Sequence, residues 1–410
     1  MDILHITDSL NPAGLGGYEA YLHYLSAELK QGGHRSLVAT QAQKRDSPES
    51  ISFPNYDVIF LPGNLLEARK WELFSMPESE RESVVEKLFR PDDLEENVKQ
   101  LVGQLRLLIQ EVKPDIIHAH STYVVFNKVL EILKNEPFLN EIPIILTIHG
   151  VPKPLILPSG KKTTDYAELI ASCPFDKILG VSDFVCEELK KNLPQERSNL
   201  VERLYLGINL DVFRPYPEIV KEWDVIFMGR LEPMKSVDLF PEMVSILSKE
   251  FPDLKVVMTG EGSLRKQIIV EFEEKDVRKY VDYLGVVETS KVPELINKSR
   301  VFIYPSRREP FGLSIVEAMA CGVPIVTTNV YGPKEIVTHG HDGMAISPDN
   351  VLELAETIKT LLLDEALRKR LSKNARKMVE NRFDIKTHAL SLVAMYKDSK
   401  ARQKEKVSGA

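Results

Sequence analysis

Short apolar runs alternate with longer amphipathic stretches along nearly the whole chain. In the first half the runs predict strands at Asp2–Thr7, Arg35–Thr40, Asp57–Leu61, Asp115–Ala119, Pro143–His149, Lys177–Val181 and Arg203–Leu206. In the second half they predict strands at Asp224–Met228, Leu254–Thr259, Val281–Leu284, Val301–Tyr304, Pro324–Thr327 and Met344–Ile346. Strands rich in Ile, Val and Leu with helices between them are typical of parallel sheets buried on both faces. The pattern predicts an α/β protein with two Rossmann-like, doubly wound domains.

The domain boundary is predicted in the linker 209–221, which contains two prolines. We expect an N-terminal domain over residues 1–208, with a charged helical elaboration at 64–113, and a second domain over 209–385. Residues 386–398 predict a helix that crosses back to the first domain, and 399–410 a polar, disordered tail. Sheets of this type bind ligands in a crevice at the carboxyl ends of their strands.

Composition narrows the function further. The net charge of −7 argues against nucleic acid as a partner, and the three separate cysteines form neither a disulfide framework nor a metal motif. No apolar run is long enough to span a bilayer, and the opening residues do not resemble a signal peptide. These features predict a cytoplasmic protein.

Three loops at strand ends carry the candidate chemistry. Gly14–Gly17 follows the first strand, and its glycines suit the approach of a phosphate to backbone N–H groups, although a tight turn is the alternative. Gly229 and Arg230, with Lys235, follow the strand that ends at Met228 and suit a diphosphate leaving group, although two solvated cations are the alternative.

The third loop is the most informative. Glu309 precedes Phe311, Gly312 and Leu313, which predict the start of a helix with free N–H groups, and Glu317 lies further along it. Two carboxylates at this separation can accept hydrogen bonds from two different diols, such as those of a sugar and a ribose. A capping loop with an exposed helical Glu is the alternative, but it does not account for the flanking sequence.

These motifs resemble retaining glycosyltransferase family four, whose members have the GT-B fold. The carriers are G-R-x4-K at Gly229–Lys235 and E-x7-E at Glu309–Glu317, with PFGLSIVEAMACGVPIV directly after Glu309. Lesser matches are GGYE at 16–19, DIIHAH at 115–120, LTIHG at 146–150 and GVSDF at 180–184. The resemblance covers nearly the whole chain and implies transfer of a sugar from a UDP- or GDP-sugar to an acceptor hydroxyl.

The resemblance also implies the roles of individual residues. Arg230, Lys235, Glu309 and His149 would form the catalytic group. Donor contacts would come from Gly16, Gly17, Gly229, Val286, Phe311, Gly312, Leu313 and Glu317. Attack from the face of the leaving diphosphate would retain the anomeric configuration. The sequence contains no Asp-x-Asp pair, so we expect neither a metal nor another cofactor.

Several alternatives stay open at this point. His149 closes an apolar strand, where a structural role is common, and His118 and His120 end another strand. A nucleotide-sugar epimerase of the same two-domain shape is the main rival function. A dinucleotide oxidoreductase fits poorly because G-x-G-x-x-G is incomplete, and intact site residues argue against a non-catalytic protein. The acceptor, whether a glycan, a lipid-linked precursor or a small molecule, is not decodable, and peripheral contact with the inner face of the membrane stays open.

Overall fold

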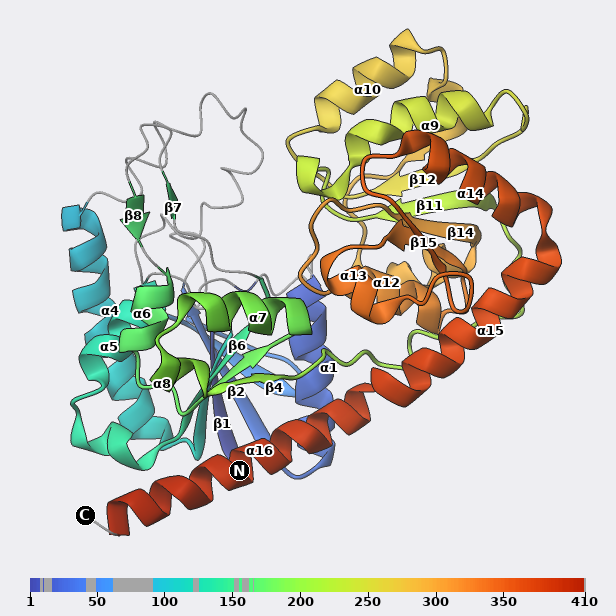
Figure 1. The fold of residues 1–410 in the computed structure, drawn as a ribbon. Coiled ribbons are helices and arrows are strands. Elements are labelled where there is room, and N and C mark those ends of the chain that lie inside the picture. The colour runs from blue at the N-terminus through green and yellow to red at the C-terminus, as the bar shows by residue number, and fades with distance from the viewer. Residues whose placement is uncertain are drawn as a thin grey trace. The chain divides into compact units, whose positions relative to one another are not determined.

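The computed structural model describes residues 1–7, 10, 17–41, 49–61, 91–120, 125–150, 155–156, 162–164 and 166–408. The chain divides into two compact units. Unit 1 consists of Met1–Pro12, Tyr21–Tyr205 and Lys386–Ala410, and unit 2 of Ala13–Ala20 and Leu206–Ile385. Each unit contains a sheet with helices packed on it (Figure 1), and the strands of both sheets are parallel except β3, which pairs antiparallel with β4. The predicted α/β class and the two doubly wound sheets are therefore confirmed.

The sheet of unit 1 has the strand order β10-β9-β6-β5-β1-β2-β4-β3. Its strands are β1 (Asp2–Thr7), β2 (Arg35–Gln41), β3 (Ser50–Ser52), β4 (Tyr56–Leu61), β5 (Ile116–His120), β6 (Ile144–Ile148), β9 (Lys177–Gly180) and β10 (Val201–Arg203); β7 (Leu155–Ile156) and β8 (Lys162–Thr164) form a separate pair. Its helices are α1 (Gly17–Gln31), α4 (Pro91–Val112), α5 (Val125–Leu133), η1 (Pro137–Glu141), α6 (Tyr166–Ser172), α7 (Asp183–Asn192), α8 (Gln195–Ser198) and α16 (Ile385–Ser408). The strand order reverses at β1, which lies between β2 and β5. The residues that end β1 and β5 therefore lie at the switch point, where such sheets bind ligands.

The sheet of unit 2 has the order β13-β12-β11-β14-β15-β16. Its strands are β11 (Trp223–Met228), β12 (Val256–Thr259), β13 (Val281–Tyr283), β14 (Ser299–Tyr304), β15 (Ile325–Thr328) and β16 (Met344–Ile346). Its helices are η2 (Pro233–Lys235), η3 (Val237–Leu239), α9 (Phe240–Leu247), α10 (Arg265–Glu274), η4 (Arg278–Tyr280), η5 (Thr289–Lys291), α11 (Val292–Asn297), α12 (Leu313–Ala320), α13 (Tyr331–Ile336), α14 (Val351–Leu363) and α15 (Glu365–Arg382). Here the switch point lies between β11 and β14.

Burial explains why these apolar runs form strands. The central strands β5 and β6 are buried at every position, and β12 and β15 likewise. Because both faces are covered, an alternating polar pattern is not required. In unit 2 the largest fully buried side chains include Phe227, Phe240 and Phe302. The rings of Phe227 and Phe240 meet edge to face, with centroids 5.0 Å apart.

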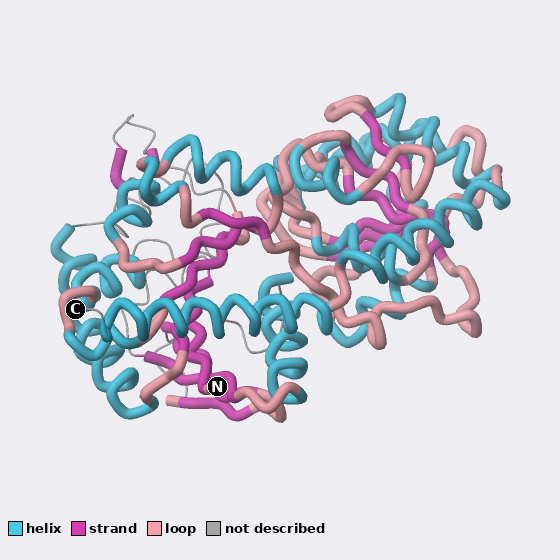
Figure 2. The backbone as a smooth tube through the Cα atoms, turned by 60° about the horizontal axis from the view of Figure 1, so that its bottom comes forward, coloured by secondary structure: helices cyan, strands magenta, loops and turns pink. Residues whose placement is uncertain are grey.

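Helix α16 belongs to unit 1 and lies along its sheet (Figure 1 and Figure 2). Tyr396 hydrogen-bonds His118 of β5 at 2.6 Å, and Gln403 donates to the carbonyl of Asn140 at 2.8 Å. Lys400 pairs with Asp115. These contacts keep residues 399–408 helical, so the predicted disordered tail is wrong for that stretch.

Smaller differences from the predicted elements have local causes. The strand predicted at Arg203–Leu206 lies earlier, at β10, because Val201 pairs with Ile178 of β9. After Lys235 the chain first forms the 3-10 turn η3, and α9 follows it with a proline in its first turn. No described helix combines the length and apolarity needed to cross a bilayer.

Candidate active site

The switch point of unit 2 brings together two oppositely charged side chains from distant parts of the sequence. Lys235 follows β11 and Glu309 follows β14, and their side chains form an ion pair across 74 residues. Both residues are buried, with 6% and 9% of their surface exposed. A buried ion pair needs further hydrogen bonds to offset its desolvation. Tyr304, the last residue of β14, supplies one by accepting from the Lys235 ammonium at 2.8 Å.

The ionisation of this pair follows from its surroundings. Burial lowers the pKa of Lys235, but the charge of Glu309 and the hydrogen bonds from both partners outweigh it, so the net shift is upward. Burial, and then the charge of Glu309, raises the pKa of Tyr304 to about 12. At neutral pH the site therefore holds an ammonium, a carboxylate and a neutral phenol. Tyr304 was not predicted as a site residue, although its position at the end of a strand is visible in the sequence.

The backbone before Lys235 packs closely against Gly260 and Gly262, which leave no room for a side chain. A Cβ at Gly260 would lie 1.9 Å from the carbonyl oxygen of Gly229, and one at Gly262 would lie 2.3 Å from that of Leu231. Leu231 also donates its N–H to Glu261 at 2.9 Å. The loop that carries Arg230 is therefore fixed against the end of β12, and the Arg230 guanidinium contacts Met234 Sδ at 3.6 Å.

The Glu309 loop leads directly into helix α12. Gly312 is the N-cap residue and has a φ of +107°, a conformation that glycine adopts without strain. No side chain caps this terminus by a hydrogen bond. The carbonyl of Glu309 accepts from Gly332 at the start of α13 at 3.0 Å, and Phe311 is buried. The helix terminus formed by Gly312 and Leu313 therefore suits an anion or a hydroxyl oxygen.

Glu317 lies within α12 and is 8% exposed. Burial raises the pKa of its carboxyl group to about 7. A carboxyl group that costs free energy to ionise is common at ligand sites, where polar ligand groups replace the lost water. The predicted base-contacting residue Val286 is 49% exposed and adjoins Gly285, whose carbonyl accepts from the Gly260 N–H at 2.7 Å.

The candidates from the first glycine loop are only partly described. Gly17 is the first residue of α1, whereas Gly16 lies outside the described residues. His149 belongs to unit 1, where it follows β6 and is half-buried. The structure thus brings Lys235, Glu309 and the start of α12 together in unit 2, and Arg230 lies on the loop that leads to Lys235. It places His149 in a different group of side chains.

That group gathers at the switch point of unit 1. In the register of β1 and β5, His5 lies beside His118 and Thr7 beside His120. A hydrogen bond of 3.0 Å joins His5 Nδ1 to His120 Nε2, and one of 3.4 Å joins His120 Nδ1 to His149 Nε2. His118 bonds Thr147 at 2.7 Å through Nε2. We call His5, His118, His120, His149 and His388 the histidine cluster.

Burial controls the ionisation of the cluster. It lowers the pKa of His5 to about 3 and that of His388 to about 4, and it lowers the pKa values of His118, His120 and His149. The rings are therefore neutral at pH 7. His388 lies between the Tyr21 hydroxyl and the carbonyl of Tyr205, at 2.8 Å from each. His5, Tyr21, His388 and Tyr396 were not singled out from the sequence, because residues far apart in the chain form this cluster.

Within the described residues, one group has the geometry of a metal site. The ligating nitrogens of His5, His118 and His120 lie within 4.8 Å of one another. Three imidazoles can bind zinc. The group contains no carboxylate to offset a divalent charge in this buried place, and His118 uses both ring nitrogens for hydrogen bonds to Tyr396 and Thr147.

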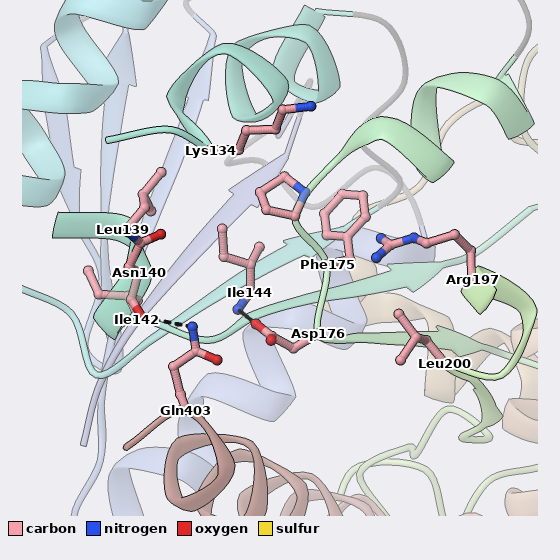
Figure 3. Close-up of a pocket in the computed structure, with 11 residues that line it drawn as sticks. Lys134, Leu139, Asn140, Ile142, Ile144, Phe175, Asp176, Arg197, Leu200 and Gln403 are labelled. Carbon is pink, nitrogen blue, oxygen red and sulfur yellow. Dashed lines mark hydrogen bonds between the residues drawn. The ribbon is translucent and has the colours of Figure 1, made fainter. Parts of the chain in front are cut away.

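A separate pocket lies at the amino ends of strands in the unit 1 sheet, away from the carboxyl ends where the histidine cluster lies (Figure 3). Its volume is about 290 Å³, and its lining includes Ile144 and Asp176, at the amino ends of β6 and β9. Arg197 and Lys134 also line it, and both donate to backbone carbonyls, at 2.8 and 3.3 Å. It contains none of the predicted site residues.

Comparison with known proteins gives matches along most of the chain. The family model described as glycosyl transferases group 1 matches residues 211–378, and the one described as glycosyltransferase family 4 matches residues 15–212. An uncharacterised glycosyltransferase of Methanocaldococcus jannaschii is 31% identical over 272 residues, which are 66% of this chain and 71% of that protein. Glycogen synthase of Mycobacterium tuberculosis is 22% identical over 418 residues, covering 99% of this chain and 96% of that one.

Solved structures share the fold at low sequence identity. Sucrose-phosphate synthase from Thermosynechococcus elongatus superposes with a TM-score of 0.78 at 20% identity, covering 98% of this chain and 99% of that one. Anabaena HepE in complex with UDP-glucose gives 0.70 at 20% identity, covering 97% and 100%. The predicted GT-B fold is therefore confirmed.

Proposed function

The chain belongs to the group 1 glycosyltransferases of family 4, and from this premise we propose that it moves a sugar from a UDP- or GDP-sugar to an acceptor hydroxyl with retention of configuration. The observation that carries the proposal is the buried pair of Lys235 and Glu309 at the switch point of unit 2. It provides a cation for a leaving diphosphate and an acceptor for sugar hydroxyls in one place. The UDP-glucose complex of HepE, which has the same fold, agrees with such a donor.

Binding of the donor would exchange protein contacts for ligand contacts. The diphosphate would take hydrogen bonds from Arg230 and Lys235 and from the uncapped start of α12. Sugar hydroxyls would donate to Glu309, and ribose hydroxyls to Glu317. Gly16, Gly17 and Gly229 would contact the phosphates, Val286 would lie beside the base, and His149 beside the sugar.

The transfer itself needs few groups from the protein. The bond between the anomeric carbon and the β-phosphate oxygen breaks, and a bond to the acceptor oxygen forms on the same face. The proton of the acceptor hydroxyl passes to the departing phosphate oxygen. Lys235, Arg230 and the α12 terminus stabilise the negative charge that develops on the diphosphate. These cations replace a divalent metal, so turnover should persist in EDTA.

The test is a double-mutant cycle on the ion pair. Lys235→Met and Glu309→Gln each leave the partner charge buried and uncompensated, which should cost about 3 kcal/mol of stability. The double variant carries no lone charge and should recover most of that loss. Turnover of a panel of UDP- and GDP-sugars should nevertheless stay at least about 100-fold below wild type in all three variants. Lys275→Ala breaks the exposed pair of Lys275 and Glu242 and is the matched control.

Two outcomes would contradict the proposal. A folded double variant with full transferase activity would show that the pair is only structural. Conversion of a UDP-sugar to its epimer in the absence of any acceptor would favour the epimerase. The acceptor class, whether glycan, lipid-linked or small molecule, is best sought with the donor that the panel identifies.

A further inference from the structure

Three histidine rings of unit 1 form a continuous hydrogen-bonded series. His5 Nδ1 lies 3.0 Å from His120 Nε2, and His120 Nδ1 lies 3.4 Å from His149 Nε2. In the pairing of β1 with β5, His5 lies opposite His118, so His120 is its diagonal neighbour two residues further along, and His149 directly follows β6. The series leads from the interior, where His5 and His120 are fully buried, to the half-buried His149.

The neutrality of the rings makes the series directional. Burial keeps the pKa values of His5 and His120 far below 7, so each ring carries one N–H and one bare nitrogen. His120 makes a hydrogen bond through each nitrogen, so it donates through one and accepts through the other. If His5 donates to His120, then His120 donates to His149, and the reverse order is the only alternative.

The inner end of the series decides between the two directions. His5 Nε2 is buried and has no hydrogen-bond partner among the described residues. In the reverse order this nitrogen would carry an unsatisfied N–H, which is rare and costly in protein interiors. With the proton on Nδ1, the donor of His5 is satisfied by His120. The favoured direction is therefore from His5 to His120 to His149.

We propose that His120, with His5 behind it, is a positioning residue that fixes the proton of His149 on Nδ1. His149 then accepts at Nε2 and offers an N–H donor at Nδ1. The Nδ1–H group suits an oxygen that accepts a hydrogen bond, such as a sugar hydroxyl or a phosphate oxygen. Because Nδ1 already carries a proton, it cannot act as a base. The part of the inference that concerns the sugar rests on the proposed function.

A metal ion is the competing use of the same rings. Bound zinc would occupy nitrogens of His5, His118 and His120, and it would break the bond between His5 and His120. The absence of a carboxylate from this group and the two hydrogen bonds of His118 favour the hydrogen-bonded series.

The test reads the tautomer directly. Full-length protein labelled with ¹⁵N at its nine histidines is studied by long-range proton–nitrogen correlation spectra, and His149→Gln identifies the His149 signals. We expect a protonated Nδ1 and a bare Nε2 in the wild type. In His120→Phe the constraint is lost, and the proton of His149 should redistribute toward Nε2. His388→Gln removes a buried histidine that has no bond to His149, and should leave the tautomer unchanged.

Each result has a defined meaning. Protonation of His149 at Nε2 in the wild type, an unchanged tautomer in His120→Phe, or histidine signals displaced by stoichiometric Zn²⁺ would overturn the inference. The wild-type spectrum decides the matter even if His120→Phe does not fold. In the transferase assay, His120→Phe should lower kcat/KM about tenfold through His149. If His149→Gln keeps full activity while the wild-type tautomer is as expected, the positioning holds and the proposed role of His149 at the sugar fails.

Discussion

Acidification should destabilise unit 1 through the histidine cluster, and His388 offers the clearest test. Burial holds the pKa of His388 at about 4, whereas an unfolded histidine has a pKa of about 6.5. At a pH between these two pKa values the unfolded chain binds more protons than the folded one. The stability associated with neutral His388 is thus fully present above about pH 6.5 and is lost as the pH falls toward 4.

The magnitude follows from the same two values. At pH 5.5, one unit below the unfolded pKa, a single histidine of this kind reduces the free energy of unfolding by about 1 kcal/mol. His5, with a pKa of about 3, contributes a similar amount, so the two together remove about 2–3 kcal/mol. This is a sizeable part of the 5–15 kcal/mol that typically stabilises a folded domain, so the free energy of unfolding of the wild type should be measurably lower at pH 5.5 than at pH 7.5.

Urea titrations of wild type and His388→Gln at pH 7.5 and 5.5 measure the effect, with hydrogen exchange of β1 and β5 peptides assigning the transition to unit 1. Glutamine can keep hydrogen bonds to Tyr21 and Tyr205 but does not titrate. Between the two pH values the free energy of unfolding of the variant should therefore fall by about 1 kcal/mol less than that of the wild type. His341→Gln, at an exposed position, is the control and should follow the wild type. An equal pH dependence in wild type and His388→Gln would refute the reasoning.

Three further predictions concern other parts of the chain. Glu317→Gln should stabilise the ligand-free protein at pH 8 by up to about 3 kcal/mol, because a buried carboxyl with a pKa of about 7 must ionise there, yet thermal shifts with UDP should become smaller. Gly262→Ala should lower the free energy of unfolding by roughly 2 kcal/mol or more in urea titrations, since its Cβ would meet a backbone oxygen. Its control Gly103→Ala, with open space around the new Cβ in α4, should raise it by about 0.5–1 kcal/mol. Arg307→Ala should lower kcat/KM about tenfold without changing the donor preference, because the Arg307 side chain donates a hydrogen bond to the carbonyl of Pro233 in the turn that carries Lys235. An unchanged kcat/KM would show that this contact is not needed to position Lys235.

The sequence by itself determined most of the local structure and the identity of the chemical groups. Runs of branched apolar residues specify strands because both faces of each sheet are covered, and this was visible without coordinates. The glycine at position 312 was expected at a helix start, and its φ of +107° gives the reason. The place of Glu317 one turn into α12 followed from the predicted helix, whose geometry depends only on neighbours in the chain, and Glu309 lies in the loop before it.

Tertiary structure alone decided which of these groups meet. Lys235 pairs with Glu309 and bonds Tyr304 because the strand order reverses between β11 and β14, and no local pattern encodes that order. His5 and His120 are 115 residues apart and become partners only through the register of β1 with β5. Their neutrality likewise comes from burial, a property of the packed chain rather than of the residue. The helical end of α16 was missed for the same reason: its polar residues look like a tail until Lys400 and Gln403 find partners in unit 1.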